Sequence, residues 1–399
     1  MIKISNIKSL VTWDNNTNQL RITDNQNLYL KNNMIAAITN ENLDFDLEID
    51  AENTIITPGF FDCHTHPIFN DSRSNDFKLR TSGKTYQEIS DQGGGINSSV
   101  ESLRKVTENE LYDKCISRID DFLFNGTTTI EAKSGYGLTL KDEIKSLNVI
   151  KKINQNHILE LIPTFLGAHA VPNNFIDKKN EYIDLICDEM IPKISSLNLA
   201  TFCDVFCENK YFNYEESLKI LTSAKNHGLI PRLHADEFED SRGIELACNV
   251  EAVSADHLMA ANEKHFDKLA NSNTVAVILP GTTFFLGQHN YVDASKLISC
   301  GCEVALATDF NPGSCTINSI PQIMFLAMTY CNMSFDDVFK AVTINAAKAI
   351  RKSSSIGLIK EGYQADLLFW EIEDIYEIPY WFNSTKISKI VKKGKLITL

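Results

Sequence analysis

Two histidines that stand one residue apart carry the clearest chemical signal in the sequence. They belong to Asp62-Cys63-His64-Thr65-His66, which ends a short apolar run. Residues i and i+2 of a strand share one face, so His64 and His66 can present two imidazoles to a single metal ion. With 9 histidines in the chain, such a pair arises by chance in roughly one sequence of five. The pair therefore indicates a metal site mainly because it stands at the end of a predicted strand.

Further polar side chains stand at the ends of later apolar runs. They are His169, His234, His257 and Asp309. Taken singly, each is equally well explained as a polar residue that is hydrogen-bonded to a neighbouring loop. Convergent polar groups at successive strand ends are how barrel enzymes build their sites, so the whole set predicts one metal-centred active site.

Eight short apolar runs, alternating with segments of helical period, must position these side chains. Strands that alternate with helices indicate a parallel sheet. Eight such units over roughly 260 residues have the size of a (β/α)₈ barrel of the TIM type, with a doubly wound open sheet as the alternative. The predicted strands are Ile56–Cys63, Thr127–Ala132, Glu160–Leu166, Phe202–Cys207, Ile230–His234, Glu251–Ala255, Val275–Leu279 and Glu303–Thr308.

Both ends of the chain instead carry short β-type runs separated by turn residues. At the N-terminal end these include Leu10–Trp13 and Met34–Ile38, and at the C-terminal end Ala365–Glu371 and Lys389–Leu399. We predict that residues 1–57 and 353–399 form one small β-sandwich domain. Residues 58–352 then form the barrel, with helices at Leu111–Phe124 and Glu215–Asn226 among its outer layer.

The bulk composition narrows the classes of partner. The formal net charge is -14 and no Lys/Arg block is present, which argues against nucleic acid or an anionic membrane as a partner. The chain has no stretch of 18 apolar residues and no hydrophobic signal core at its start. Its 10 cysteines form no disulfide or zinc-finger pattern, which is typical of a reducing compartment. We therefore expect a cytoplasmic protein that acts on a small molecule.

The run from Pro58 to His66 resembles the opening motif of the amidohydrolase superfamily, and the segments around Thr343–Ala347 and Gly362–Asp366 resemble its tail. The resemblance implies a metal-dependent hydrolase whose metal ligands are His64, His66, His234 and Asp309. Members with two metals have a carboxylated lysine on the fourth strand. Here that strand ends in Cys207-Glu208, with no lysine before Lys210, so the resemblance favours a single ion. Zn²⁺ and Fe both suit mixed histidine and carboxylate ligation. Lys133, after the second strand, is expected to be a substrate-side or structural cation.

Several stretches resemble the imidazolonepropionase family within that superfamily, and together they span nearly the whole barrel. These stretches are Ser72-Arg73, Gly93-Gly94-Gly95-Ile96, Lys133-Ser134-Gly135-Tyr136-Gly137, Phe165-Leu166-Gly167-Ala168-His169, His234-Ala235-Asp236-Glu237, Asp256-His257-Leu258, Leu279-Pro280-Gly281-Thr282 and Asp309-Phe310-Asn311-Pro312-Gly313-Ser314. The resemblance implies that the chain opens the cyclic amide of 4-imidazolone-5-propanoate, an intermediate of histidine breakdown, to give N-formimidoyl-L-glutamate. It also implies a homodimer.

The chemistry can be assigned to three residues. Asp309 can take the proton of the attacking water, Glu237 can move protons to the water or the ring nitrogen, and His257 can polarise the ring carbonyl. Sequence does not decide which of the three is the working base. Arg73 supplies a planar fork for the substrate carboxylate. The other expected substrate-binding residues are Tyr136, His169, Glu237, Asn311, Gly313 and Ser314.

Two other functions remain open at this stage. Another amidohydrolase with one metal, such as a purine or pyrimidine deaminase, would share the four ligands but would not need Arg73 and Tyr136 at the metal as a carboxylate-binding pair. A barrel that has lost its chemistry is the second alternative, and it is disfavoured because such a scaffold should lack ligands, whereas all four are present. The run Gly93-Gly94-Gly95 is not followed by Lys-Ser/Thr, so a flexible loop is expected there and not a phosphate site.

Overall fold

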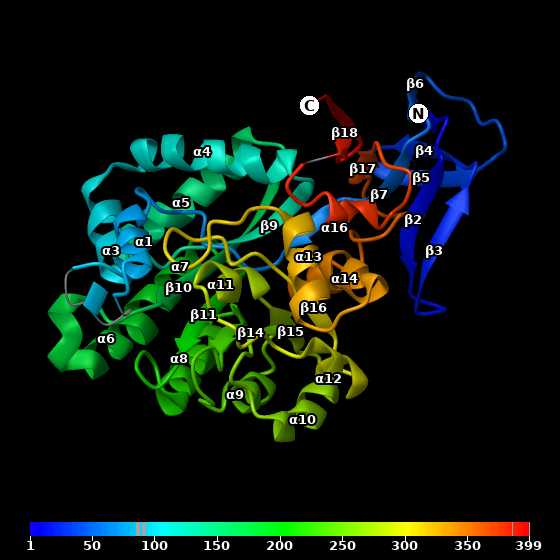
Figure 1. Ribbon diagram of the computed structural model, residues 1–399. Helices are drawn as coiled ribbons and strands as arrows, with labels where there is room; N and C mark the ends of the chain where they lie inside the picture. The colour runs from blue at the N-terminus through cyan, green and yellow to red at the C-terminus, as the bar shows by residue number, and fades with distance from the viewer. Residues whose placement is uncertain (85–87, 90–92, 385, 399) are drawn as a thin grey trace.

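A computed structural model describes residues 1–84, 88–89, 93–384 and 386–398 of the chain. Figure 1 shows a barrel surrounded by helices, with a smaller β-rich unit at one side that contains both ends of the chain. The barrel strands are β8(Phe60–Asp62), β9(Thr127–Lys133), β10(Glu160–Ala168), β11(Phe202–Cys207), β12(Ile230–Pro231), β13(Leu233–Ala235), β14(Ser254–His257), β15(Val275–Ile278) and β16(Val304–Leu306).

The barrel strands are parallel and pair in chain order from β8 to β16, with β12 and β13 both pairing with β11. The two outer strands meet at their carboxyl ends. A parallel bridge joins Thr65 to Phe310, and the amide of Asp309 donates to the carbonyl of His64 at 3.1 Å. These contacts bring the first and last strands together, which excludes the doubly wound open sheet. The predicted (β/α)₈ barrel is confirmed.

The first predicted strand, Ile56–Cys63, is wrong as a single element. Its first half is β7(Ile55–Pro58), which pairs with strands of the small β-rich unit, and its second half is β8 of the barrel. Gly59 lies at the crossing. A Cβ built there would come within 2.3 Å of Thr128 Oγ1, so the absence of a side chain lets the chain pass directly over β9.

Two other predicted strands differ in extent. Glu251–Ala255 begins three residues too early, because Glu251 has φ 54° and ends the preceding helix, and β14 begins at Ser254. The fifth predicted strand, Ile230–His234, is divided into β12 and β13. The remaining predicted barrel strands overlap the observed ones.

Helices cover the outside of the barrel, and several begin with well-formed caps. In α4(Glu108–Phe124) the Thr107 hydroxyl and the Glu110 carboxylate form a reciprocal capping box, which satisfies amides that the helix cannot bond itself. Asn213 and Glu216 do the same for α8(Tyr214–Asn226). The other α-helices are α1(Ser74–Thr81), α3(Ile96–Lys105), α5(Leu140–Asn156), α6(Lys179–Leu185), α7(Ile191–Ser196), α9(Gly243–Val250), α10(Phe266–Ala270), α11(Pro280–Phe285), α12(Ala294–Ser299), α13(Ile320–Tyr330), α14(Phe335–Val342), α15(Ile344–Ala349) and α16(Glu377–Tyr380). Two short 3-10 helices, η1(Asn173–Lys178) and η3(Glu263–His265), and one π-helical turn, η2(Ile186–Met190), complete the helical segments named here.

The smaller unit contains two sheets. A six-stranded sheet runs β19-β18-β17-β7-β2-β3 and a four-stranded sheet runs β5-β4-β1-β6. Apolar side chains from both sheets, among them Ile4, Leu28 and Phe369, share one buried cluster, as expected for a sandwich. The boundaries at 57/58 and 352/353 stay a prediction. The strands are β1(Ile2–Ser5), β2(Ser9–Asp14), β3(Gln19–Asp24), β4(Asn27–Lys31), β5(Met34–Thr39), β6(Leu47–Asp50), β7, β17(Leu367–Trp370), β18(Ile387–Lys392) and β19(Lys395–Thr398).

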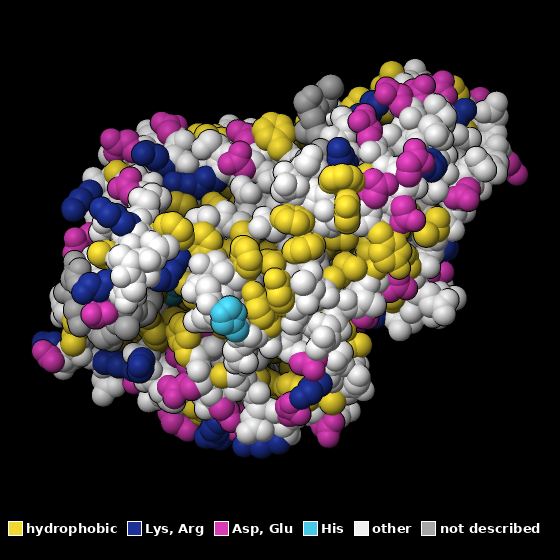
Figure 2. All heavy atoms as spheres, viewed as in Figure 1, with side chains coloured by type: hydrophobic (Ala, Val, Ile, Leu, Met, Phe, Trp, Pro, Cys, Tyr) yellow, Lys and Arg dark blue, Asp and Glu magenta, His cyan; other side chains and the backbone are white. Residues whose placement is uncertain are grey.

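The face of the molecule in Figure 2 carries acidic and basic side chains side by side, and hydrophobic side chains gather over the region of α13, α14 and α16. Within the described residues, no helix combines the length and the apolar character that a membrane crossing requires. All ten cysteines are free, and most of them are buried.

Candidate active site

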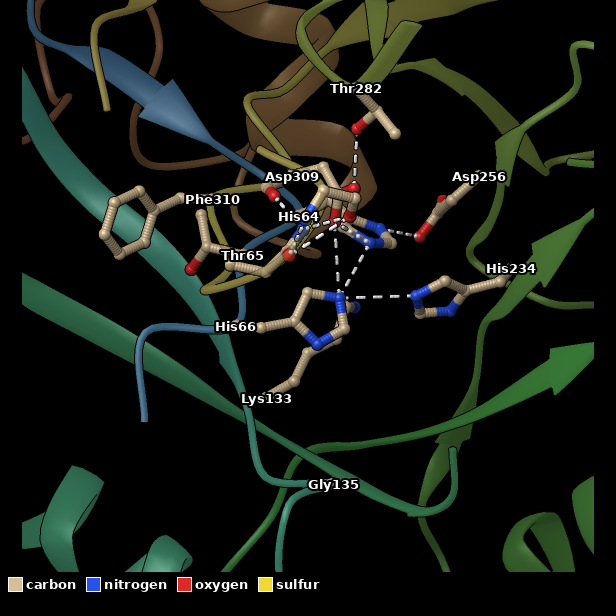
Figure 3. Close-up of polar contacts among 12 residues, drawn as sticks. His64, Thr65, His66, Lys133, Gly135, His234, Asp256, Thr282, Asp309 and Phe310 are labelled. Carbon is tan, nitrogen blue, oxygen red and sulfur yellow. Dashed lines mark hydrogen bonds and ion pairs between the residues drawn. The ribbon is translucent and has the colours of Figure 1, made fainter. Parts of the chain in front are cut away.

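Three histidines converge at the carboxyl end of the barrel (Figure 3). His64 and His66 follow β8, and His234 lies in β13. The Nε2 atom of His66 lies 3.3 Å from Nε2 of His64 and 3.3 Å from Nε2 of His234. All three rings are buried, so water does not separate their polar edges. The structure thus brings three of the four sequence-predicted metal ligands together.

The fourth predicted ligand, Asp309, joins the same cluster. Its Oδ1 atom lies 3.5 Å from His64 Nε2 and 3.4 Å from His66 Nε2. Metal–ligand bonds of about 2.0–2.1 Å in tetrahedral geometry place neighbouring ligand atoms roughly 3.4 Å apart. The spacings of His66 from His64, His234 and Asp309, and of His64 from Asp309, fit this arrangement.

Carboxylates behind the rings fix which nitrogen faces the cluster. His64 Nδ1 lies 2.7 Å from Asp256 Oδ2, and His234 Nδ1 lies 3.1 Å from Asp204 Oδ1. An Nδ1–H that donates to a carboxylate leaves Nε2 with its lone pair free to bind a metal. Burial also lowers the pKa of His66 to about 4, which keeps that ring neutral and able to act as a ligand.

A fully buried group of charges lies beside these carboxylates. Lys133 Nζ is 2.9 Å from Glu131 Oε1 and 2.8 Å from Asp204 Oδ2. Arg232 donates to Asp256 at 2.7 Å and lies 3.6 Å from Glu131. Lys133 is therefore a structural cation within the barrel, which settles the choice left open for it by the sequence.

Glu237 and His257 lie together in the same region. Glu237 Oε2 is 3.6 Å from His257 Nε2, and neither ring nitrogen of His257 has a hydrogen-bond partner among the described residues. Burial raises the pKa of Glu237 well above its usual range, and the charges of Asp309 and Glu208 add to that rise. Burial also holds the pKa of His257 well below its usual range. A proton-holding carboxyl and a neutral imidazole are thus side by side, as acid–base chemistry needs.

Glu208, at the end of the fourth barrel strand, anchors the backbone that carries Glu237. Its Oε1 atom accepts hydrogen bonds from the amides of Glu237 at 2.6 Å and Phe238 at 3.0 Å, and its Oε2 atom accepts one from Ser241 Oγ at 3.1 Å. The carboxylate at the end of the fourth strand, where no lysine stands before Lys210, therefore has a structural task.

The rings of Tyr136 and His169 lie beside the predicted metal ligand His66. The His169 ring stacks on His66 with centroids 5.2 Å apart, and Tyr136 lies 5.2 Å from His169. His169 Nδ1 bonds the carbonyl of Gly135 at 2.9 Å. Glu143 fixes this loop, because its carboxylate accepts bonds from the amides of Gly135, Gly137 and Leu138. Both predicted substrate-binding side chains therefore border the metal ligands.

Arg73 lies across the loop that follows Asp309. The Arg73 amide donates to the carbonyl of Pro312 at 3.2 Å. A Cβ built on Gly313 would lie 1.4 Å from Nη2 of Arg73, so the guanidinium rests directly on the glycine backbone. Its Nε atom is buried and has no hydrogen-bond partner among the described residues.

Asn311 organises the same loop from within. Its side-chain oxygen accepts bonds from the amides of Gly313 and Ser314, and its Nδ2 atom donates to the Asp309 carbonyl and to Ser314 Oγ. The side-chain amide of Asn311 thus makes these hydrogen bonds to the loop itself. Arg73 and Gly313 are in direct contact and Ser314 belongs to the same loop, while their binding of substrate stays a prediction.

Sequence reasoning missed the buried charges that support the histidines. Glu131, Asp204, Arg232 and Asp256 were present in or beside the predicted strands, but no role was assigned to them. A charged residue inside an otherwise apolar strand is the signal that could have found them, since buried charges occur where they are paired.

These elements give a parallel barrel with a candidate metal site of histidines and Asp309 at the carboxyl end of its strands. Residues 55–397 match the model of the amidohydrolase family, a metal-dependent family. The chain is 40% identical over 389 residues to the imidazolonepropionase of Brevibacillus brevis, covering 95% of this chain and 92% of that one. It is 44% identical over 349 residues to the imidazolonepropionase of Alkaliphilus oremlandii, covering 88% and 83%. The chain belongs to the imidazolonepropionase family.

Solved structures show the same fold at low identity. A 5-methylcytosine deaminase from Klebsiella pneumoniae superposes with a TM-score of 0.75 at 18% identity, covering 99% of this chain and 97% of that one. A guanine deaminase from C. acetobutylicum has a TM-score of 0.75 at 15% identity, with 99% of each chain covered. These likenesses support the barrel and its accompanying sheets, and they do not favour deamination as the activity.

Proposed function

We propose that the protein hydrolyses the cyclic amide of 4-imidazolone-5-propanoate to N-formimidoyl-L-glutamate. The observation that carries the proposal is the cluster of His64, His66 and His234, with Asp309 contacting the first two and with Glu237 and His257 beside it, in a chain that belongs to the imidazolonepropionase family. In this reaction water attacks the ring carbonyl carbon. The bond from that carbon to the ring nitrogen breaks, and the carbonyl becomes a second carboxylate.

We propose one Zn²⁺ or Fe ion per chain, held by the three histidines and Asp309. When bound, such an ion supplies Lewis acidity, which lowers the pKa of a coordinated water toward neutrality. The single-ion assignment is supported by Glu208, whose carboxylate is committed to backbone amides and to Ser241. It is also supported by Lys133, whose ammonium group is paired with Glu131 and Asp204.

The protein's own groups then divide the proton transfers. Asp309 can receive a proton from the attacking water, because its Oδ1 atom faces the Nε2 atoms of His64 and His66. His257, which burial keeps neutral, can donate a hydrogen bond to the ring carbonyl as negative charge develops there. Glu237, which burial keeps protonated, can deliver a proton to the leaving ring nitrogen. Arg73 would bind the propanoate carboxylate, and Tyr136, His169, Asn311, Gly313 and Ser314 would line the ring.

The test is a spectrophotometric assay with freshly made imidazolone propanoate and metal-replete protein. Loss of the substrate's ultraviolet absorbance should far exceed the spontaneous rate, and Arg73→Ala should slow it severely. Arg73→Lys is the matched control, because it keeps the positive charge and removes the planar fork. No decay above the spontaneous rate, with one ion confirmed per chain by metal analysis, would reject this substrate and direct attention to other cyclic amides and aminated purines.

We also propose a homodimer, supported by the family resemblance, and residence in the cytoplasm, supported by ten free cysteines. Sedimentation analysis of the purified protein tests the assembly, and a monomer at micromolar concentration would exclude the dimer. The expectation that nucleic acid is not a partner stays a prediction from the net charge of -14.

A further inference from the structure

The Asp309 carboxylate has a different partner on each of its two oxygens. Oδ1 faces the Nε2 atoms of His64 and His66. Oδ2 accepts a hydrogen bond of 2.6 Å from the hydroxyl of Thr282, on the opposite side of the carboxylate (Figure 3). Thr282 belongs to α11 and is fully buried, so this hydroxyl is shielded from water.

Asp309 needs such support because its local conformation is unusual. Its φ is 54°, in the left-handed region that residues with a Cβ rarely adopt. Its amide is fixed to the His64 carbonyl, and its carbonyl accepts from Asn311. These bonds hold the backbone, but the terminal torsion of an aspartate is broad and sets no single carboxylate plane. The Thr282 hydroxyl is a contact to Oδ2 that restricts that plane from the side away from the histidines.

The chain reaches this position through a close approach of α11 to the end of β16. A Cβ on Gly281 would lie 2.9 Å from Ile323 Cδ1, 3.0 Å from Cys315 Sγ and 3.2 Å from the Thr308 carbonyl. The absence of a side chain at Gly281 therefore lets the helix pack directly against the segment that carries Asp309. Thr282, the next residue, is placed within hydrogen-bond distance of the carboxylate as a result.

We propose that Thr282 is a positioning residue that holds Asp309 Oδ1 toward the Nε2 atoms of His64 and His66 in the proposed metal site. The kinetic part of this inference rests on the proposed hydrolysis, whereas its structural part concerns the ligand geometry alone. A threonine hydroxyl has one hydrogen, and here it is donated to Oδ2. Oδ1 is thereby left to face the histidines and to act in ligation and proton transfer.

Thr282→Val is the decisive variant, because it replaces the hydroxyl by a methyl group of similar size. Thr283→Val is the matched control. Thr283 is the next residue of the same helix, is equally buried, and donates its hydroxyl to the Met259 sulfur at 2.9 Å. Each protein is loaded with Co²⁺, whose visible absorption reports ligand geometry, and each is also assayed for kcat and KM.

We expect Thr282→Val to change the Co²⁺ spectrum and to lower kcat by roughly 10- to 100-fold with KM within about 2-fold, as for loss of a charge-assisted bond that acts on the reacting centre. Thr283→Val should keep the wild-type spectrum and rates. Thr282→Ser should retain most of the activity, because serine keeps the hydroxyl. If Thr282→Val does not fold, Thr282→Ser and Thr282→Ala replace it, since both lack the methyl group and differ in the hydroxyl.

A wild-type Co²⁺ spectrum together with wild-type kcat in Thr282→Val would overturn the inference, and so would an equal loss in Thr283→Val. The spectra separate this result from failure of the proposed function. If the wild-type protein leaves imidazolone propanoate intact, the spectral difference between Thr282→Val and Thr283→Val still decides whether Thr282 positions Asp309.

Discussion

The contact between Arg73 and Gly313 allows the proposed binding of the substrate carboxylate by Arg73 to be tested without changing Arg73 itself. In Gly313→Ala the new Cβ would lie 1.4 Å from Nη2, 1.9 Å from Cζ and 2.2 Å from Nε of Arg73. All three distances are far below van der Waals contact, so the guanidinium must leave its position. The bond lost to the substrate carboxylate is charge-assisted and worth about 1.5–3 kcal/mol, or roughly 10- to 150-fold in binding.

We expect Gly313→Ala to raise KM by an amount in that range while kcat changes by only about 2- to 3-fold, since the carboxylate is remote from the bond that breaks. Adding Gly313→Ala to Arg73→Ala should have little further effect, because both changes remove the same interaction. Gly228→Ala is the control for a general cost of alanine. Gly228 has φ 82° and open space around it, so that variant should lose stability and keep its KM.

The assay is steady-state hydrolysis of imidazolone propanoate, with circular dichroism to confirm folding. A wild-type KM in Gly313→Ala would refute the reasoning, because it would mean that the displaced guanidinium does not bind the substrate. A KM increase in the double variant equal to the product of the two single effects would also refute it, since the two residues would then act independently.

Three further predictions concern the metal and its supports. Removal of the ion by a chelator should abolish hydrolysis and lower the thermal unfolding midpoint, with recovery on adding one equivalent of Zn²⁺ or Fe²⁺; activity in verified metal-free protein would contradict this. Arg232→Met removes a cation that contacts the buried carboxylates of Asp256 and Glu131. It should lower the free energy of unfolding, measured in urea, by about 3–5 kcal/mol, and a decrease below about 1 kcal/mol would contradict this role of Arg232. Glu143→Ala leaves three loop amides without their acceptor, which costs about 1–3 kcal/mol of folding free energy for each amide. It should also raise KM, because the same loop carries Tyr136. Glu143→Gln should lose less stability than Glu143→Ala, and equal losses would contradict the role of the carboxylate oxygens.

Much of the fold could be predicted because its signals are local. Alternating apolar runs and helical segments predicted the barrel, and polar residues at the strand ends predicted a shared site, since parallel strands present their carboxyl ends at one face; the set of metal ligands was implied by the family resemblance. The division of Ile56–Cys63 into two strands was not predictable in the same way. It depends on Gly59 passing over Thr128, which is a contact between segments far apart in the chain.

The supporting charges were harder to predict for a related reason. A lone charge in an apolar strand is ordinarily assigned to the solvent face, whereas inside a barrel it can be buried when opposite charges reach it from neighbouring strands. Arg232 illustrates this, because its partners Glu131 and Asp256 lie on β9 and β14 and become neighbours only after the barrel closes. A local pattern can mark the charge, but it does not show which opposite charges pair with it.

The placement of these charges has a consequence for how the site is organised. Asp256 contacts both His64 and Arg232, and Asp204 contacts both His234 and Lys133. The carboxylates that orient two metal-binding imidazoles are therefore the same groups that neutralise the buried cations. The orientation of the ligands is thus coupled to the packing of the barrel interior, because an imidazole cannot turn without leaving a buried charge less well paired.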